Sequence, residues 1–144
     1  MDEKLNAANI PEIWETEEEK GLSVKELKEK YTVYAKSRFI KQPSLVVQNA
    51  GTAWSIEITS KVVKEWWKKS RTRPRIIAIQ LLDTMVGTSA LLDTADDRKN
   101  TPGIESVSEF GNHCKINGEL YNVRIIVKKQ ADRYFAYYYS VIKV

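Results

Sequence analysis

The chain has one cysteine and one histidine among its 144 residues, and both shortages narrow the chemistry open to it. A single cysteine excludes an intramolecular disulfide and fits a reducing compartment. One cysteine and one histidine are too few for a structural zinc site. The sequence also lacks a phosphate-binding glycine motif, a spacing that supports a Ser-His-Asp triad, and the carboxylate cluster of two-metal nucleases. We therefore expect neither a metal nor another cofactor.

Long apolar runs are missing as well. No stretch of 18 apolar residues could form a transmembrane helix. Asp2 and Glu3 lie where a secretory signal peptide would carry positive charge. We therefore expect a cytoplasmic protein without a membrane partner. The length fits one domain with a single core, and 42% hydrophobic and 29% charged residues are typical of globular proteins.

Charge is distributed unevenly along the chain. The net charge is +4, but residues 1–20 hold seven acids and two lysines, so the remaining residues carry +9. A basic body suggests a polyanionic partner such as nucleic acid. We divide the chain into an acidic segment plus helix, 1–40, and an α+β domain, 41–144. The acidic run from Glu15 to Glu19 is expected to be mostly solvated, either as a solubilising tail or as a mask over the basic surface.

Helix signals come first in the chain and strand signals last. Ser23 and Glu26 form a capping box that begins a helix fading near Lys36. Later in the chain the pattern predicts a strand pair at 45–48 and 53–59, followed by a helix from Ser60 to about Lys69 with Trp66 and Trp67 in the core. A long apolar helix is then expected from Pro74, with residues 90–92 extending its apolar face. Residues 93–103 are expected to form a polar loop.

Residues 110–144 read as three antiparallel strands. Asn117-Gly118 predicts a type I′ turn that pairs Ile116 with Glu119. A looser turn at 129–132 is expected to pair Lys128 with Arg133. Because side chains alternate along a strand, this register predicts an apolar face with Phe110, Cys114, Tyr121, Val123, Ile125, Val127, Tyr134, Ala136 and Tyr138. The opposite face would carry His113, Lys115, Asn122, Arg124, Ile126, Lys128, Arg133, Phe135, Tyr137 and Tyr139.

The second face is either an ordinary solvated surface or a site for metal-free RNA cleavage. In such cleavage the 2′-hydroxyl of RNA attacks its own phosphate, and the protein supplies a base, an acid and cations. A histidine side chain is a common acid or base in catalysis, which suggests that role for His113, and the guanidinium of Arg124 suits a phosphate. Lys128 and Tyr137 could assist. The expected catalytic residues are therefore Arg124, His113, Tyr137 and Lys128.

A second cationic region runs from Lys61 to Arg75, with seven cations and one acid. It is either a solvated surface or a set of phosphate contacts, which require only cation density and reach. The expected nucleic-acid-binding residues are Lys61, Lys64, Lys68, Lys69, Arg71, Arg73 and Arg75, together with Arg133 and Tyr139 of the strands.

The runs Val46-Val47-Gln48-Asn49, Trp54-Ser55-Ile56-Glu57-Ile58, the stretch 116–128 and Tyr137-Tyr138-Tyr139 together give the chain a family likeness. From about residue 44 to 144 it resembles the large polyvalent protein-associated domains of phages and mobile elements. These are similar in turn to the barnase–EndoU–colicin–RelE-like nucleases. The resemblance implies an α+β fold with N-terminal helices followed by an antiparallel sheet, and metal-independent cleavage of RNA, often tRNA or mRNA.

Three functions remain open from the sequence. The first is an RNA-cleaving, toxin-like domain of a phage or mobile element, whose protein partner would be a cognate immunity or host protein. The second is a non-catalytic accessory domain that binds nucleic acid or a host protein, and Lys69-Ser70, where many such nucleases have a His-Ser pair, fits this reading. The third is an inhibitor that uses the acidic segment to bind a cationic site.

Overall fold

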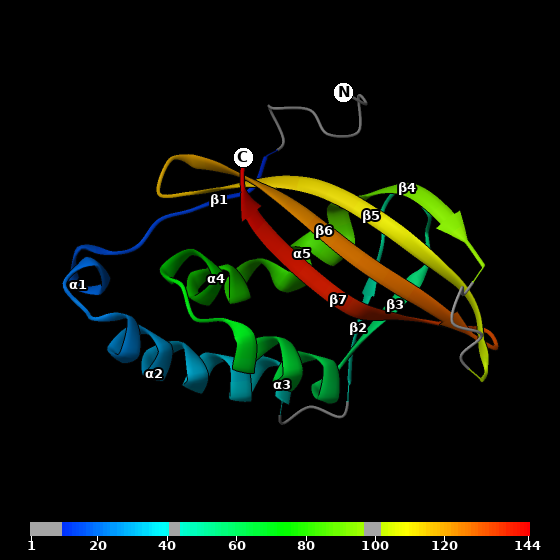
Figure 1. Ribbon diagram of the computed structural model, residues 1–144, viewed down its shortest axis with the longest axis horizontal. Coiled ribbons are helices and arrows are strands. Elements are labelled where there is room, and N and C mark those ends of the chain that lie inside the picture. The colour runs from blue at the N-terminus through cyan, green and yellow to red at the C-terminus, as the bar shows by residue number, and fades with distance from the viewer. Residues whose placement is uncertain (1–9, 41–43, 97–101) are drawn as a thin grey trace.

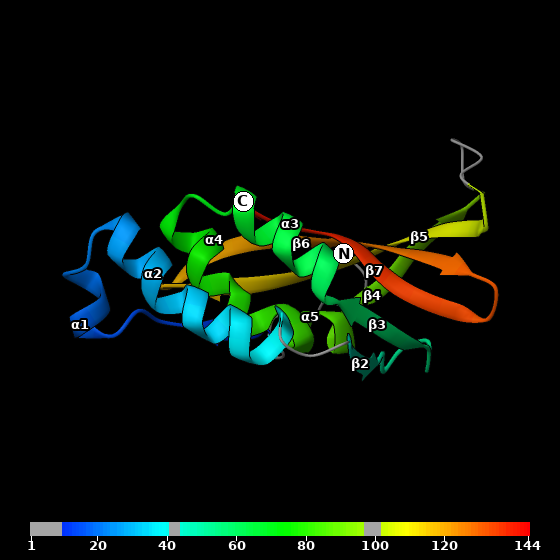
Figure 2. The same cartoon turned by 90° about the horizontal axis from the view of Figure 1, so that it is seen from below.

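Three long strands dominate the computed structural model, which describes residues 10–40, 44–96 and 102–144. They are β5 (Ile104–Ile116), β6 (Glu119–Gln130) and β7 (Arg133–Lys143), joined as an antiparallel meander. The strands curl, and the helices lie together on one side of them (Figure 1). Figure 2 shows that the end of the sheet formed by the β6–β7 turn projects beyond the helices.

Four shorter strands complete a mixed sheet. β2 (Ser44–Gln48) and β3 (Ser55–Thr59) form an antiparallel hairpin, and β3 runs parallel to β7. On the other side, β1 (Glu12–Ile13) runs parallel to β5, while β4 (Ala90–Ala95) pairs antiparallel with it. The described strands follow the order β1-β5-β6-β7-β3-β2, with β4 also on β5. The α+β class is confirmed, but the sheet is not purely antiparallel, because parallel pairs join strands distant in sequence that no local pattern reveals.

The helices are short and cover one face of this sheet. They are α1 (Glu17–Lys20), α2 (Val24–Ala35) with a π-helical turn at Lys36–Ile40, α3 (Ser60–Lys69), α4 (Arg73–Ile77), a 3-10 turn at Ala78–Leu81, and α5 (Leu82–Thr88). The apolar helix predicted from Pro74 is helical from Arg73 to Thr88, but a 3-10 turn at Ala78–Leu81 divides it, so it is not one regular α-helix. Its apolar residues correctly indicate burial, since Ile76, Ile77 and Ile79 are fully buried, but an all-round apolar pattern does not specify a regular helix. Residues 90–92 lie in β4, not on a helix.

One core joins the helices to the inner face of the sheet. Leu27 and Phe39, which belong to the expected segment 1–40, pack in the same cluster as Ile77 of α4 and Ile125 of β6. Because these side chains are almost completely removed from water, their burial is the main source of stability. Within the described ranges, no helix has the length and apolar character needed to span a bilayer.

Local signals set the helix starts. Ser23 caps α2 as predicted: its Oγ accepts a hydrogen bond from Glu26 N at 3.1 Å, and Glu26 Oε1 accepts one from Ser23 N at 2.9 Å. The cap of α3 is Thr59, one residue before the predicted Ser60. The predicted strand pair before α3 is also confirmed as β2 and β3.

The first hairpin of the meander has the predicted register. Ile116 pairs with Glu119 and Phe110 with Ile125, and both turn residues have positive φ, 53° at Asn117 and 82° at Gly118. This agrees with the type I′ assignment.

The second hairpin differs from the prediction. Its turn has two residues, so Gln130, not Lys128, pairs with Arg133. A β-bulge then leaves Tyr137 as an extra residue, because Val127 pairs with Ala136 and Ile126 pairs with Tyr138.

The bulge exchanges the faces of the residues that follow it. Tyr138, predicted on the apolar face, is 44% exposed, and Tyr139, predicted on the polar face, is 4% exposed. The predicted register of β7 and the predicted surface position of Tyr139 are therefore wrong. The sequence could not reveal the bulge, because consecutive tyrosines occupy both faces of the strand and an extra residue among them does not change the hydrophobic pattern.

Candidate functional site

A groove opens where β3 separates from β7. The two strands pair at only two positions, Ile56 with Tyr134 and Glu57 with Phe135, and the chain then leaves the sheet to begin α3 at Ser60. The resulting space between α3 and β7 has a volume of about 850 Å³. In Figure 2 α3 runs beside β7, the arrangement that makes the two walls. The lining residues are Glu57, Thr59, Lys61, Val62, Glu65, Trp66, Lys69, Gln130, Ala131, Arg133, Phe135, Tyr137, Tyr138 and Tyr139.

Aromatic side chains form the β7 wall of the groove. The bulge turns both Tyr137 and Tyr138 outward, where they are 51% and 44% exposed. Trp66 of α3 closes the inner side, with its ring centroid 4.9 Å from that of Tyr139. Tyr139 Oη donates a hydrogen bond to the backbone oxygen of Ala78 at 3.2 Å. Burial raises the pKa of Tyr139 well above its usual value, so its phenol stays neutral and serves the wall as a structural residue.

Contacts with α2 hold the α3 wall in place. Lys28 Nζ donates a hydrogen bond to Ser70 O at 2.7 Å and lies 3.9 Å from the ring centroid of Trp67. Trp67 Nε1 donates to Thr32 Oγ1 at 3.0 Å. Burial lowers the pKa of Lys28 to about 8. These contacts bind the end of α3 to α2, which fixes the spacing between α3 and the strands.

Cations line the α3 side of the groove. Lys61 and Lys69 both belong to the lining, and in the described part of the chain no carboxylate lies within 4.0 Å of either ammonium. Lys64 and Lys68 are exposed on the same helix, and Lys68 lies 3.8 Å from Glu65. The predicted cationic region therefore borders the groove along α3, and it continues through the exposed Arg71 to the half-buried Arg75.

Arg133 enters the groove from the β6–β7 turn. Its guanidinium forms two hydrogen bonds with the carboxylate of Glu57, one from Nε to Oε2 at 2.7 Å and one from Nη2 to Oε1. The hydrogen bond from Arg133 lowers the pKa of Glu57. Arg133 is thus part of the groove, but its charge is already neutralised by a neighbour.

The four expected catalytic side chains do not meet at one point. Lys128 Nζ lies 3.6 Å from the ring centroid of Tyr137, beside the groove. Arg124 lies four residues before Lys128 on β6, about 13 Å away at the usual rise of a strand, and pairs with Glu109 at 3.0 Å. His113 pairs with Asn122, which lies two residues before Arg124 on β6. Only Lys128 and Tyr137 belong to the groove region.

The comparisons place this fold in a family. A family model, large polyvalent protein-associated domain 3, matches residues 23–138. The chain belongs to this family. The match begins at the cap of α2, earlier than the start near residue 44 expected from the sequence. Comparisons with curated proteins and with solved structures give no match, so the likeness to nucleases stays a prediction.

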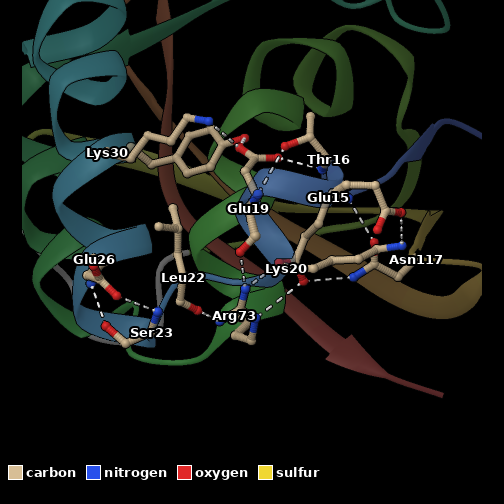
Figure 3. Close-up of polar contacts among 12 residues, drawn as sticks. Glu15, Thr16, Glu19, Lys20, Leu22, Ser23, Glu26, Lys30, Arg73 and Asn117 are labelled. Atoms are coloured by element: carbon tan, nitrogen blue, oxygen red, sulfur yellow. Dashed lines mark hydrogen bonds and ion pairs between the residues drawn. The ribbon is translucent and has the colours of Figure 1, made fainter.

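Arg73 of this polyvalent protein-associated domain has a structural role instead of the predicted phosphate contact (Figure 3). It forms an ion pair with Glu15 and donates hydrogen bonds to Leu22 O at 2.6 Å and Glu19 O at 2.7 Å. Asn117 Nδ2 donates to Glu15 Oε1 at 2.9 Å. The hydrogen bond from Arg73 lowers the pKa of Glu15. Arg73 therefore joins α4, the N-terminal segment and, through Glu15, the first hairpin turn, and four of its five guanidinium N–H groups are engaged there.

The acidic segment of the domain serves the fold as well. Glu19 is 2% exposed and accepts hydrogen bonds from Thr16 N at 2.8 Å and Tyr31 Oη at 2.5 Å, with Lys30 Nζ at 3.1 Å (Figure 3). The expectation of a solvated run is therefore wrong for Glu15 and Glu19, although Glu17 and Glu18 are exposed. None of the described residues up to Lys20 lines the groove, so a mask over the basic surface is not seen in this part of the chain.

Several groove residues were missed or misassigned from the sequence. Trp66 was assigned to the core but is only half-buried, and Tyr138 was assigned to the apolar face. Glu57 had no predicted role. The dense cluster of aromatic residues in β7 was the sequence feature that could have indicated the groove. The bulge that exposes these residues, however, depends on the pairing of β7 with β6. Among the described residues, no group of three or more His, Cys, Asp and Glu side chains could hold a metal ion.

Proposed function

We propose that this domain binds single-stranded RNA in the groove between α3 and β7. The observation that supports the proposal is the pairing of two wall chemistries: exposed tyrosines at 137 and 138 on β7, and the ammonium groups of Lys61 and Lys69 on α3. Proteins that bind single strands combine aromatic side chains, on which bases stack, with a cationic track for the backbone. Each stacked base contributes about 1–3 kcal/mol.

The shape of the groove favours a single strand over a duplex. A volume of about 850 Å³ accommodates one or a few unstacked nucleotides, since ligand pockets of roughly 300–1,000 Å³ hold small molecules of that size. Bases within a duplex are already stacked and cannot reach Tyr137 or Tyr138. The phosphates of a bound strand would follow the exposed lysines of α3, where Lys64 and Lys68 extend the charge beyond the groove.

Fluorescence anisotropy with labelled oligonucleotides tests this function. We expect single-stranded RNA to bind more tightly than a duplex of the same length, with affinity that falls as salt rises. Replacing both Lys61 and Lys69 by Gln should weaken binding by roughly tenfold or more, since two phosphate contacts are lost. The matched control replaces Lys25 and Lys36 of the α2 region by Gln, because both are exposed and the net charge changes equally. Equal losses in the two double variants would exclude the groove as the binding site.

Metal-independent RNA cleavage is a second candidate function, supported by the contact between Lys128 and Tyr137. In this proposal the 2′-oxygen of RNA loses its proton to water and forms a bond to phosphorus, while the bond to the 5′-oxygen breaks and that oxygen takes a proton from water, giving a 2′,3′-cyclic phosphate and a 5′-hydroxyl. Lys128 stabilises the negative charge on the phosphoryl oxygens, and Tyr137 donates a hydrogen bond to them. In this proposal cleavage takes place beside the groove and no longer involves His113 or Arg124. A toxin-like domain, with a cognate immunity or host protein as its partner, would require such a cleavage activity.

An RNA cleavage assay in the presence of EDTA separates the two candidates. Cyclic-phosphate ends that persist with EDTA, and that are lost in Lys128→Met and Tyr137→Phe, would support cleavage. His113→Ala and Arg124→Ala serve as controls, since both residues lie away from the groove and should retain activity. Salt-dependent binding without any product would leave RNA binding as the function. Loss of product in the His113 and Arg124 variants alone would contradict the groove assignment.

A further inference from the structure

The ion pair between Arg133 and Glu57 closes one part of the groove. A guanidinium that makes two parallel hydrogen bonds to a carboxylate has the same geometry that it uses to hold a phosphate. Both residues belong to the groove lining, and the Nε–Oε2 distance is 2.7 Å. The carboxylate of Glu57 therefore occupies the position that a phosphate oxygen pair would take on Arg133.

The two partners differ in how firmly they are held. Glu57 lies in β3 beside Phe135 of β7, and its side chain is 14% exposed. Arg133 directly follows the two-residue turn at the end of the meander, and its side chain is 72% exposed. The acid is thus fixed by the sheet, while the long arginine side chain has water on most of its surface. Ion pairs with such an exposed partner contribute little to stability, so an arriving phosphate can replace the carboxylate.

The remaining cations of the groove have no comparable partner. Lys61 and Lys69 have no carboxylate within ion-pair distance among the residues that the structure describes. Arg133 is the lining cation whose charge is cancelled within the groove, and the lowered pKa of Glu57 keeps that carboxylate ionised at neutral pH. The effective positive charge of the groove is therefore smaller than its composition suggests.

We propose that Glu57 is an internal competitor of the RNA phosphate that limits the affinity of the groove by holding Arg133. The inference rests on the proposed RNA binding and adds a specific regulator of it. In the free protein Glu57 neutralises Arg133. In the bound protein a phosphate takes the two donors of Arg133, and Glu57 is left facing the anionic strand. Removing the negative charge of Glu57 should therefore strengthen binding instead of weakening it.

The test compares Glu57→Gln with Glu119→Gln in the full chain. Glu119 pairs with Lys143 at 3.1 Å, far along the sheet from the groove, so both variants change the net charge by the same amount. We expect Glu57→Gln to tighten binding of a labelled single-stranded RNA by roughly three- to tenfold, because Arg133 no longer gives up an ion pair to reach the phosphate. The slope of log affinity against log salt should steepen by about 0.7, because Arg133 then neutralises one phosphate of a single strand without its charge being offset by Glu57. Glu119→Gln should change neither quantity.

Adding Arg133→Ala to the Glu57→Gln variant shows whether Arg133 is responsible for the gain in affinity and slope. The double variant should return to the salt slope of the unchanged protein. If Glu57→Gln matches Glu119→Gln in affinity and slope while the unchanged protein binds RNA, the competitor role is wrong and RNA binding stands. If neither the unchanged protein nor Glu57→Gln binds RNA, both proposals fail. Thermal unfolding of each variant confirms that the compared proteins are folded.

Discussion

The buried carboxylate of Glu19 should make the stability of this domain depend on pH in a way that one substitution removes. Burial by itself raises the pKa of Glu19, but the hydrogen bonds from Thr16 and Tyr31 and the ammonium of Lys30 outweigh it and lower the pKa from 4.5 to about 2. A difference of this size corresponds to about 3 kcal/mol of unfolding free energy at neutral pH.

The sign follows from the direction of the shift. Because the pKa is lower in the folded state, the contribution is complete above pH 4.5 and is lost as the pH falls toward 2. At pH 3 about 1.4 kcal/mol of it remains, so about 2 kcal/mol disappears between pH 7 and pH 3. Glu19→Gln has no carboxylate to titrate. The gap in unfolding free energy between the unchanged protein and Glu19→Gln should therefore shrink by about 2 kcal/mol over this range.

Urea unfolding followed by tryptophan fluorescence at several pH values measures that gap. Glu17→Gln is the matched control, since Glu17 lies in the same helix with a side chain 92% exposed, and its replacement removes the same charge outside the buried contacts of Glu19. The comparison cancels the titration of other carboxylates, which both proteins share. A gap that stays constant from pH 7 to pH 3 would refute the argument, because Glu19 would then have the same pKa in the folded and unfolded states.

Three further changes test other parts of the structure. Tyr139→Phe should lower the unfolding free energy by about 1 kcal/mol through loss of a buried hydrogen bond, and it should leave RNA binding unchanged in anisotropy measurements. Gly118→Ala should destabilise the domain by about 1–2 kcal/mol in urea titrations, because its φ of 82° is unfavourable for a residue with a Cβ atom. Arg73→Met should lower the unfolding free energy by about 3–5 kcal/mol, since it leaves Glu15 buried without its partner. Arg71→Met should change stability by less than about 0.5 kcal/mol, while weakening RNA binding and reducing its salt dependence.

The capping box and the first hairpin were predictable because their signals are local. Ser23 and Glu26 satisfy backbone groups within one turn of helix. Asn117 and Gly118 adopt positive φ with little strain, which fixes the turn type and with it the register of two long strands. In each case the residues that carry the signal are also those that make the contact.

Parts of the candidate site could not be predicted, because they depend on partners distant in sequence. The role of Arg73 is set by Glu15, which lies 58 residues away in the chain. The ion pair between Glu57 and Arg133 spans 76 residues. A cation count over 61–75 cannot distinguish an arginine that is free to bind phosphate from one already committed to a buried acid.

By itself, the sequence determined the α+β class, the cap of α2, the first hairpin turn and the alternation that buries one face of β5 and β6, since these follow from short-range geometry and hydrophobic pattern. Tertiary structure decided where β3 leaves β7, on which side Tyr138 and Tyr139 lie, and which cations remain free. The physical reason is that a bulge and a parallel pair are properties of two strands together, and the side chains they expose are set by that pairing.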